Sequence, residues 1–251
     1  MDWTKAKTIL IIALIVTDIF LIVTYGGRKD EEEFGNTEAL IAVLESSNIY
    51  VDSGDIPDRH RNMPALAVEY KGVSQDEINA LIESTETAAA DDSDGAYKEA
   101  AEDFVSYLGM MSEYIGGAKV VREPAENENS GAGGGEVKVV FGCEIDETKL
   151  DGSYMICTFS DRKVIDFDSY WLEPGEFSTK KQETISAAVA LITYMSEREE
   201  REEVHISGIE LVYWVNSASY DSMAAVTDTA LPTWRITFDD GKTVHIEAFE
   251  R

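Results

Sequence analysis

The chain has 251 residues, of which 28% are charged and 44% are hydrophobic, a balance typical of a globular protein rather than a disordered one. Its formal net charge at pH 7 is −28. Such an excess of negative charge excludes nucleic acid, and direct docking on anionic lipid, because phosphate groups are repelled.

The first predicted element is a membrane-spanning helix over residues 8–26, preceded by a cytoplasmic N-terminus of residues 1–7. The apolar run TILIIALIVTDIFLIVTY would rise roughly 27 Å as a helix, close to the ~30 Å hydrocarbon core of a bilayer. Trp3 and Tyr25 stand near its ends, where amphipathic rings anchor a helix at the membrane interface. A cleaved signal peptide is the alternative, but the run exceeds the ~7–15 residues of a signal core and no A-x-A-like site follows it.

Asp18 is the one acidic residue inside this apolar run. An ionised carboxylate at bilayer depth costs about 2.5–3.5 kcal/mol, so it is either a tolerated polar residue or a contact with another protein's transmembrane helix. Its helical neighbours three and four residues away are apolar and offer it no partner. Ala13 and Thr17 form a small-x-x-x-small pair that permits close helix approach. We therefore predict a partner-binding surface of Asp18, Thr17, Phe20 and Leu21 within the membrane.

A polar tether is predicted over residues 27–35, and a first extracytoplasmic α+β subdomain over residues 36–122. Ser74 and Glu77 fit a capping box, in which each side chain bonds the other residue's backbone amide at a helix start. Helices are expected over residues 36–47, 74–90 and 97–108, and strands over residues 49–51, 66–70 and 118–122.

Residues 123–135, EPAENENSGAGGG, lack the apolar content to pack. They are predicted to be a linker between subdomains, or alternatively the tip of a long hairpin that joins the strands on either side. A second extracytoplasmic subdomain is predicted over residues 136–251, as three strands, a helix and three strands. Because sheet is followed by helix and then sheet, the expected class is antiparallel α+β. The strands are expected over residues 137–145, 153–160, 163–172, 204–215, 233–238 and 242–249, and the helix, with a capping box at Thr179 and Gln182, over residues 179–198.

The two cysteines, Cys143 and Cys157, fall on neighbouring predicted strands. A turn centred on Leu150 would place them opposite each other, with Cβ atoms about 4.5–5.5 Å apart. They therefore form either a disulfide or two buried thiols.

The sequence carries no recognisable catalytic or metal-binding motif. The sequence has no G-x-S-x-G, H-E-x-x-H or P-loop motif, and His60, His205 and His245 lack metal-like spacing. Residues 92–95, Asp-Ser-Asp-Gly, resemble part of a calcium loop, but Ala90 and Ala101 occupy its first and twelfth positions, where ligands are essential. No catalytic residue, cofactor or metal ligand is predicted. Two other functions stay open, although no motif supports either: a binding module for a small ligand, cation or wall polymer, and an anchored hydrolase.

The opening sequence MDWTKAKTILIIALIVTDIFLI resembles the N-terminus of the YycI (WalI) regulatory proteins, in the YycH/YycI family. The shared features are Met-Asp-Trp, a following basic residue at Lys5, and Asp18 followed by Ile-Phe-Leu. Residues 47–57, 63–68 and 231–244 are similar to the family as well. The glycine-rich insert at residues 131–135 and the strong acidity are departures from its pattern.

The resemblance implies a single-pass membrane protein with a cytoplasmic N-terminus and an extracytoplasmic body. Such proteins are not enzymes, and they act beside a YycH-like protein on the sensor histidine kinase YycG (WalK). This two-component system controls cell-wall metabolism, and contact through transmembrane helices is part of the regulation. The expected fold is α+β, with one N-terminal transmembrane helix followed by an extracytoplasmic body of two small antiparallel-sheet-plus-helix subdomains.

Overall fold

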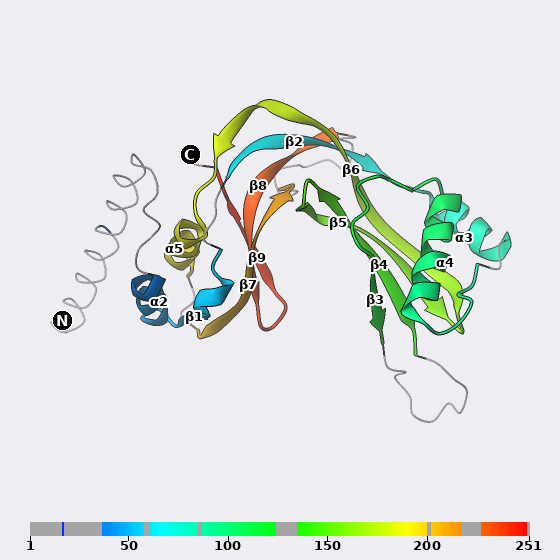
Figure 1. Cartoon of the computed structure of the whole chain (residues 1–251), viewed down its shortest axis with the longest axis horizontal. Coiled ribbons are helices and arrows are strands. Elements are labelled where there is room, and N and C mark those ends of the chain that lie inside the picture. The colour runs from blue at the N-terminus through cyan, green and yellow to red at the C-terminus, as the bar shows by residue number, and fades with distance from the viewer. Residues whose placement is uncertain are drawn as a thin grey trace. The chain divides into compact units, whose positions relative to one another are not determined.

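The computed structural model describes Thr17 and residues 37–57, 61–84, 87–123, 135–199, 202–216 and 227–249. These residues form a nine-stranded sheet and four α-helices (Figure 1). The helices are α2 (Thr37–Glu45), α3 (Gln75–Ser84), α4 (Asp94–Tyr107) and α5 (Ala187–Glu197), with a short 3-10 helix η1 (Ser53–Asp55). The strands are β1 (Ile49–Val51), β2 (Asn62–Lys71), β3 (Lys119–Arg122), β4 (Val137–Ile145), β5 (Thr148–Ser160), β6 (Lys163–Glu183), β7 (Val204–Trp214), β8 (Thr227–Phe238) and β9 (Thr243–Glu247).

The predicted body of two small antiparallel-sheet-plus-helix subdomains is wrong. The strands form one mixed sheet in the order β1-β7-β8-β2-β6-β5-β4-β3, with β9 beside β8, and β7 runs parallel to both β1 and β5. No described helix is long and apolar enough to cross a membrane, and of residues 8–26 only Thr17 is described. Strand alternation reports which face of a strand is buried, not which distant strand lies beside it.

The chain divides into two compact units whose segments alternate along the sequence. Unit 1 comprises residues 1–60, 185–209 and 236–246, and unit 2 comprises residues 61–184, 210–235 and 247–251. Segments distant in the sequence therefore build each unit.

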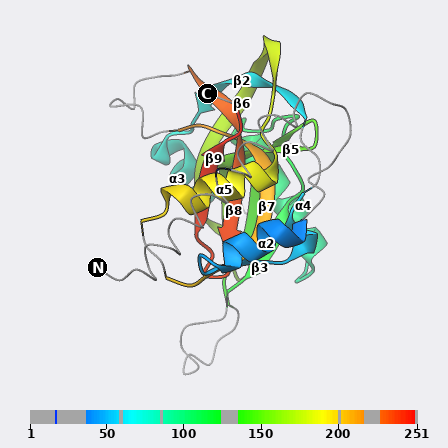
Figure 2. The same ribbon diagram turned by 90° about the vertical axis from the view of Figure 1, so that its left-hand side faces the viewer.

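In unit 1, helices α2 and α5 lie against each other and cover one face of the strands (Figure 2). Strand β1 pairs with the start of β7, with Ile49 opposite Val204. Tyr194 of α5 packs on Phe238 of β8 with ring centroids 5.5 Å apart. Each helix places its apolar side chains against the sheet, because in so small a unit the sheet is the surface that can remove these side chains from water. The buried residues include Leu40, Leu44, Ile49, Ala190, Leu191, Ile206 and Ile236.

In unit 2, strands β3, β4, β5 and β6 form an antiparallel meander, and α3 and α4 pack on one face of it (Figure 1). Phe104 of α4 contacts Phe167 of β6 with ring centroids 5.8 Å apart, and Tyr97 meets Phe159 edge to face at 5.2 Å. Such aromatic pairs add about 0.5–1.5 kcal/mol beyond the area that they bury.

Predictions of local structure in unit 2 are largely confirmed. The capping box at α3 is present, since the Glu77 carboxylate accepts from the Ser74 amide at 3.1 Å and the Glu77 amide donates to Ser74 Oγ at 3.3 Å. Residues 123–135 follow the second of the two interpretations. Strands β3 and β4 on either side of them pair directly, with Arg122 opposite Val137, so they connect a hairpin.

The predicted helix over residues 179–198 begins too early. Its first residues continue β6 and pair with β2, where Gln182 lies opposite Met63 and Lys181 opposite Pro64. Helix α5 starts at Ala187, and the N-cap is Ser186, whose Oγ accepts from the Val189 amide at 3.3 Å. Pairing with a distant strand overrides the local capping signal at Thr179, because intrinsic helix propensity is a weak preference.

Candidate functional site

The residues predicted to bind a partner within the membrane fall largely outside the described part of the chain. Thr17 is helical and its side chain is exposed. Asp18, Phe20 and Leu21, and the predicted interface anchors Trp3 and Tyr25, lie outside the described residues. Their roles therefore remain predictions from the sequence.

The two cysteines are free and buried. The predicted turn at Leu150 is displaced: the chain turns at Asp146 and Glu147, both with positive φ, as a two-residue hairpin turn requires. This register places Cys143 opposite Leu150 and Cys157 opposite Val139. A bridge between the two thiols is excluded in this register, because four residues of β4 separate their positions.

Burial raises the pKa of both thiols to about 12, since neither thiolate could be solvated there. We expect alkylation by iodoacetamide at pH 8 to be about 10³-fold slower in the folded chain than in urea, because the thiolate fraction falls with each pKa unit. Burial of the neutral thiols contributes its full stabilisation below the pKa that a cysteine thiol has in the unfolded chain. This contribution is lost as the pH rises toward 12. Mass spectrometry of the labelled chain measures both rates, and fast labelling of the folded chain would contradict the buried placement.

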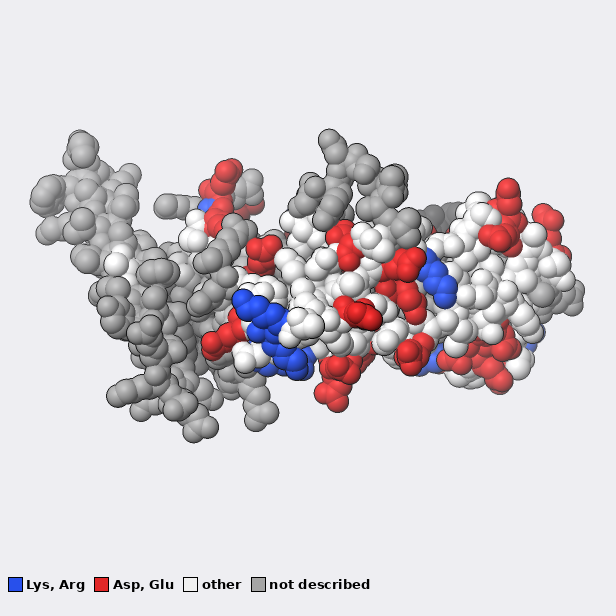
Figure 3. Space-filling view, turned by 90° about the horizontal axis from the view of Figure 1, so that it is seen from above, with Lys and Arg blue, Asp and Glu red and all other residues white. Residues whose placement is uncertain are grey.

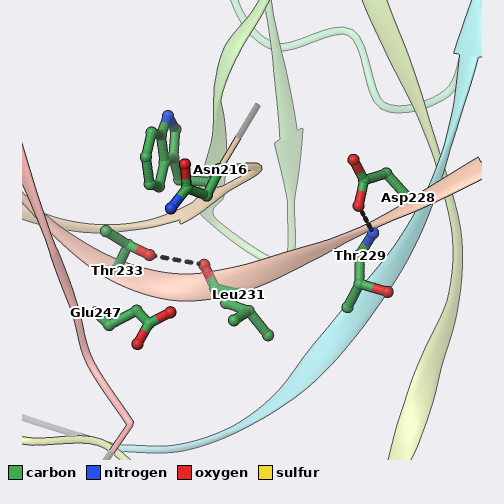
Figure 4. Close-up of a pocket in the computed structure, with 7 residues that line it drawn as sticks. Asn216, Asp228, Thr229, Leu231, Thr233 and Glu247 are labelled. Atoms are coloured by element: carbon green, nitrogen blue, oxygen red, sulfur yellow. Dashed lines mark hydrogen bonds between the residues drawn. The ribbon is translucent and has the colours of Figure 1, made fainter. Parts of the chain in front are cut away.

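A shallow depression of about 230 Å³ opens in unit 2 beside the end of β7 (Figure 4). Asn216, Thr233 and Glu247 lie at one end of it, and Asp228 and Thr229 lie at the other. Thr233 Oγ1 donates to the Leu231 carbonyl at 3.0 Å, and Asp228 accepts from the Thr229 amide at 2.6 Å. The full lining is Trp214, Asn216, Asp228, Thr229, Leu231, Thr233 and Glu247.

The chemistry of this depression is limited. Its volume is below the ~300–1,000 Å³ of ordinary ligand pockets, and the described hydrogen bonds of Thr233 and Asp228 are made within the chain. The depression has room for a small polar group beside the Trp214 indole. The geometry therefore adds little to the predicted alternative of a binding module.

A second constellation in unit 2 is an ion-pair network around Arg235 of β8. The guanidinium contacts the Asp151 carboxylate and lies 2.5 Å from Glu210, which also pairs with Lys149 at 2.9 Å. The network links β8, β5 and β7, so its evident role is to hold these strands together.

On the face seen in Figure 3, acidic side chains are spread over the described residues, and basic side chains lie in a few small groups. Within the described ranges, no three or more His, Cys, Asp and Glu side chains gather to hold a metal ion. In the acidic loop that resembles part of a calcium site, Arg122 donates to Asp94 and to the Asp92 carbonyl, both at 2.8 Å. Ser93 of that loop is the N-cap of α4.

The sequence analysis did not predict this depression, although Trp214 lies in the strand expected over residues 204–215. Its lining comes from β7 and Asn216 just after it, from β8 and from β9, and the pairing of distant strands leaves no local signal in the sequence. The strand expected over residues 233–238 begins earlier, at Thr227, and contains Pro232, a residue that usually lies at the start of a strand or on an edge strand.

Comparison with known proteins gives only a distant likeness. No protein-family model matches the chain, and no curated protein matches it. Among solved structures, the chain is similar to the crystal structure of an uncharacterized protein from Eubacterium rectale ATCC 33656. The two share 7% sequence identity over 79% of this chain and 86% of the other, with a TM-score of 0.44.

Proposed function

We propose that the chain is a non-enzymatic regulator of a sensor histidine kinase in a two-component system that controls cell-wall metabolism. In this proposal the apolar segment of residues 8–25 holds the chain at the cell membrane, with the N-terminus cytoplasmic and the body extracytoplasmic. A YycH-like protein acts beside it. The observation that carries the proposal is Asp18 within the YycI-like opening sequence.

Asp18 supports contact with another chain because a carboxylate in hydrocarbon is costly unless it is paired. Its own helical neighbours are apolar, so a partner must supply the hydrogen bond. Interhelical hydrogen bonds in membranes contribute about 1–2 kcal/mol, which is a bias of roughly 5- to 30-fold.

Regulation follows if this bond forms better with one arrangement of the kinase helices than with the other. A bound protein shifts a two-state equilibrium only by the difference between its binding free energies to the two states. The extracytoplasmic body would add contacts with the YycH-like protein.

The test is the replacement of Asp18 by leucine in the full chain. We expect co-purification of the kinase from membranes to fall about 5- to 30-fold, because the bond to the carboxylate is lost while the segment becomes more apolar. Asp18→Asn should retain part of the association, since an amide still forms hydrogen bonds. Thr24→Leu, in the same apolar run, is the matched control and should change little.

Membrane fractionation and mass spectrometry of the purified complex are the measurements. Undiminished kinase recovery with Asp18→Leu would contradict the proposal. So would release of the mature chain into the medium without its first residues.

A further inference from the structure

The two helices of unit 2 both pack on one face of its sheet, and the side chains of the other face form a separate surface. Phe167 and Trp171 of β6 point to the helices and are buried in the core. Successive side chains of a strand point to opposite faces. The intervening Asp168 and Tyr170 therefore point away from α3 and α4, and both are exposed.

Three tyrosines gather on this second face, one each from β2, β5 and β6. Tyr154 lies directly opposite Tyr170 across the β5–β6 pair. The rings of Tyr70 and Tyr170 are 5.6 Å apart between centroids and tilted by 42°. Tyr70 is 48% exposed and Tyr170 is 40% exposed. We call Tyr70, Tyr154 and Tyr170 the tyrosine face.

Carboxylates border the tyrosine face. Asp168 accepts a hydrogen bond from Tyr154 Oη at 3.1 Å, and Asp166 is exposed on the same face of β6, opposite Thr158. Tyrosine rings beside carboxylates attract a guanidinium, which can stack on the ring and donate to the acid at once.

The chain itself uses this chemistry on the helix-covered side of the same unit. The Arg122 guanidinium lies 5.4 Å from the centroid of the Tyr97 ring, and it donates to Asp94 at 2.8 Å. A tyrosine and an aspartate of the chain thus bind one of its own arginines, with the Arg122 and Asp94 side chains 48% and 63% exposed. The tyrosine face offers the same pair of groups at the surface.

We propose that the tyrosine face binds an arginine-bearing segment of the YycH-like protein that acts beside this chain. This rests on the proposed function, because that function supplies a partner beside the body. A protein is favoured over anionic lipid because the border is acidic and the chain carries a net charge of −28. Tyrosine and arginine are also the residues that most often dominate protein interfaces.

The first test uses the double variant Tyr70→Ser and Tyr170→Ser in the full chain, in membranes that retain Asp18. We expect 10- to 30-fold weaker recovery of the YycH-like protein, as for interface hot spots. Tyr107→Ser is the matched control, because Tyr107 is 64% exposed at the end of α4 and lies outside the tyrosine face. Asp168→Asn should weaken recovery and reduce its dependence on salt.

The second test keeps a ring at the site and does not depend on the stability of the double variant. A photoreactive phenylalanine is placed at position 170, or at position 107 as control, and the adducts are identified by mass spectrometry. The proposal expects position 170 alone to capture the co-purifying partner through a peptide that contains arginine. Adducts with a second copy of this chain, lipid or glycan, or equal capture at both positions, would overturn it.

Failure of the two proposals can be told apart. If Asp18→Leu abolishes kinase recovery but position 170 captures nothing selectively, the docking surface is wrong and the function stands. If no kinase is recovered with the unchanged chain, the proposed function fails. Selective capture at position 170 of a protein other than the YycH-like protein would overturn the docking proposal and leave the proposed function standing.

Discussion

Replacement of Trp171 by alanine is expected to lower the free energy of unfolding by about 3–5 kcal/mol, the range for a large aromatic side chain removed from a core. Trp171 is fully buried on β6 among the core residues of unit 2. Its indole Nε1 also donates to Glu173 at 2.7 Å, and Ser112 donates to the same carboxylate at 2.8 Å. The alanine variant therefore leaves a cavity and removes one described donor from Glu173.

Trp171→Phe separates these two contributions. It keeps most of the buried ring and loses the indole N–H, so a loss of about 1–2 kcal/mol is expected. Tyr107→Ala serves as the surface control and should change stability by less than about 0.5 kcal/mol. Urea denaturation followed by far-ultraviolet circular dichroism measures all three. A loss below about 1 kcal/mol for Trp171→Ala would contradict the placement of this side chain in the core.

Replacement of Arg235 by methionine is expected to cost about 2–3 kcal/mol. The guanidinium is the shared partner of Asp151 and Glu210, whose side chains are 17% and 41% exposed. Removing one member of a buried ion pair costs about 3–5 kcal/mol, because the remaining charge is left uncompensated. The loss expected for Arg235→Met is smaller, because water screens the charge of Glu210. In addition, the buried Arg235 Nε has no acceptor among the described residues, so its removal loses no hydrogen bond there.

Lys149→Met is the matched control for the Arg235 network, because Lys149 pairs with the same Glu210 carboxylate. Its side chain is 52% exposed, so a loss below about 1 kcal/mol is expected. Salt should diminish the effect of Lys149→Met more than that of Arg235→Met. Equal losses for the two variants in the same denaturation experiment would show that strand β8 is not held through the Arg235 guanidinium.

Local chemistry predicted several elements correctly. The capping box at Ser74 and Glu77 marks the start of α3, and the apolar stripe of residues 97–108 lies within α4 and its C-cap. The break expected between the strands of residues 153–160 and 163–172 is also correct, since Asp161 and Arg162 form a turn there with positive φ and Ser160 pairs with Lys163. These signals are readable because each depends on contacts between residues a few positions apart.

The candidate sites were predicted only in part. Asp18 is visible in the sequence because one acid in an apolar run stands out by its cost in lipid. The tyrosine face was not predicted, because Tyr70 and Tyr170 are brought together by the pairing of β2 with β6. No pattern within either strand indicates that pairing.

The sequence by itself determined the apolar N-terminal segment and the approximate positions of most of the described helices and strands. Only the tertiary structure decided the strand order, the start of β5 at Thr148 and the extension of β6 to Glu183. Moving the turn from Leu150 to Asp146 and Glu147 shifted the register and separated Cys143 from Cys157. The physical reason is that side-chain alternation fixes a strand's buried face, whereas its neighbours are chosen by the packing of the whole sheet.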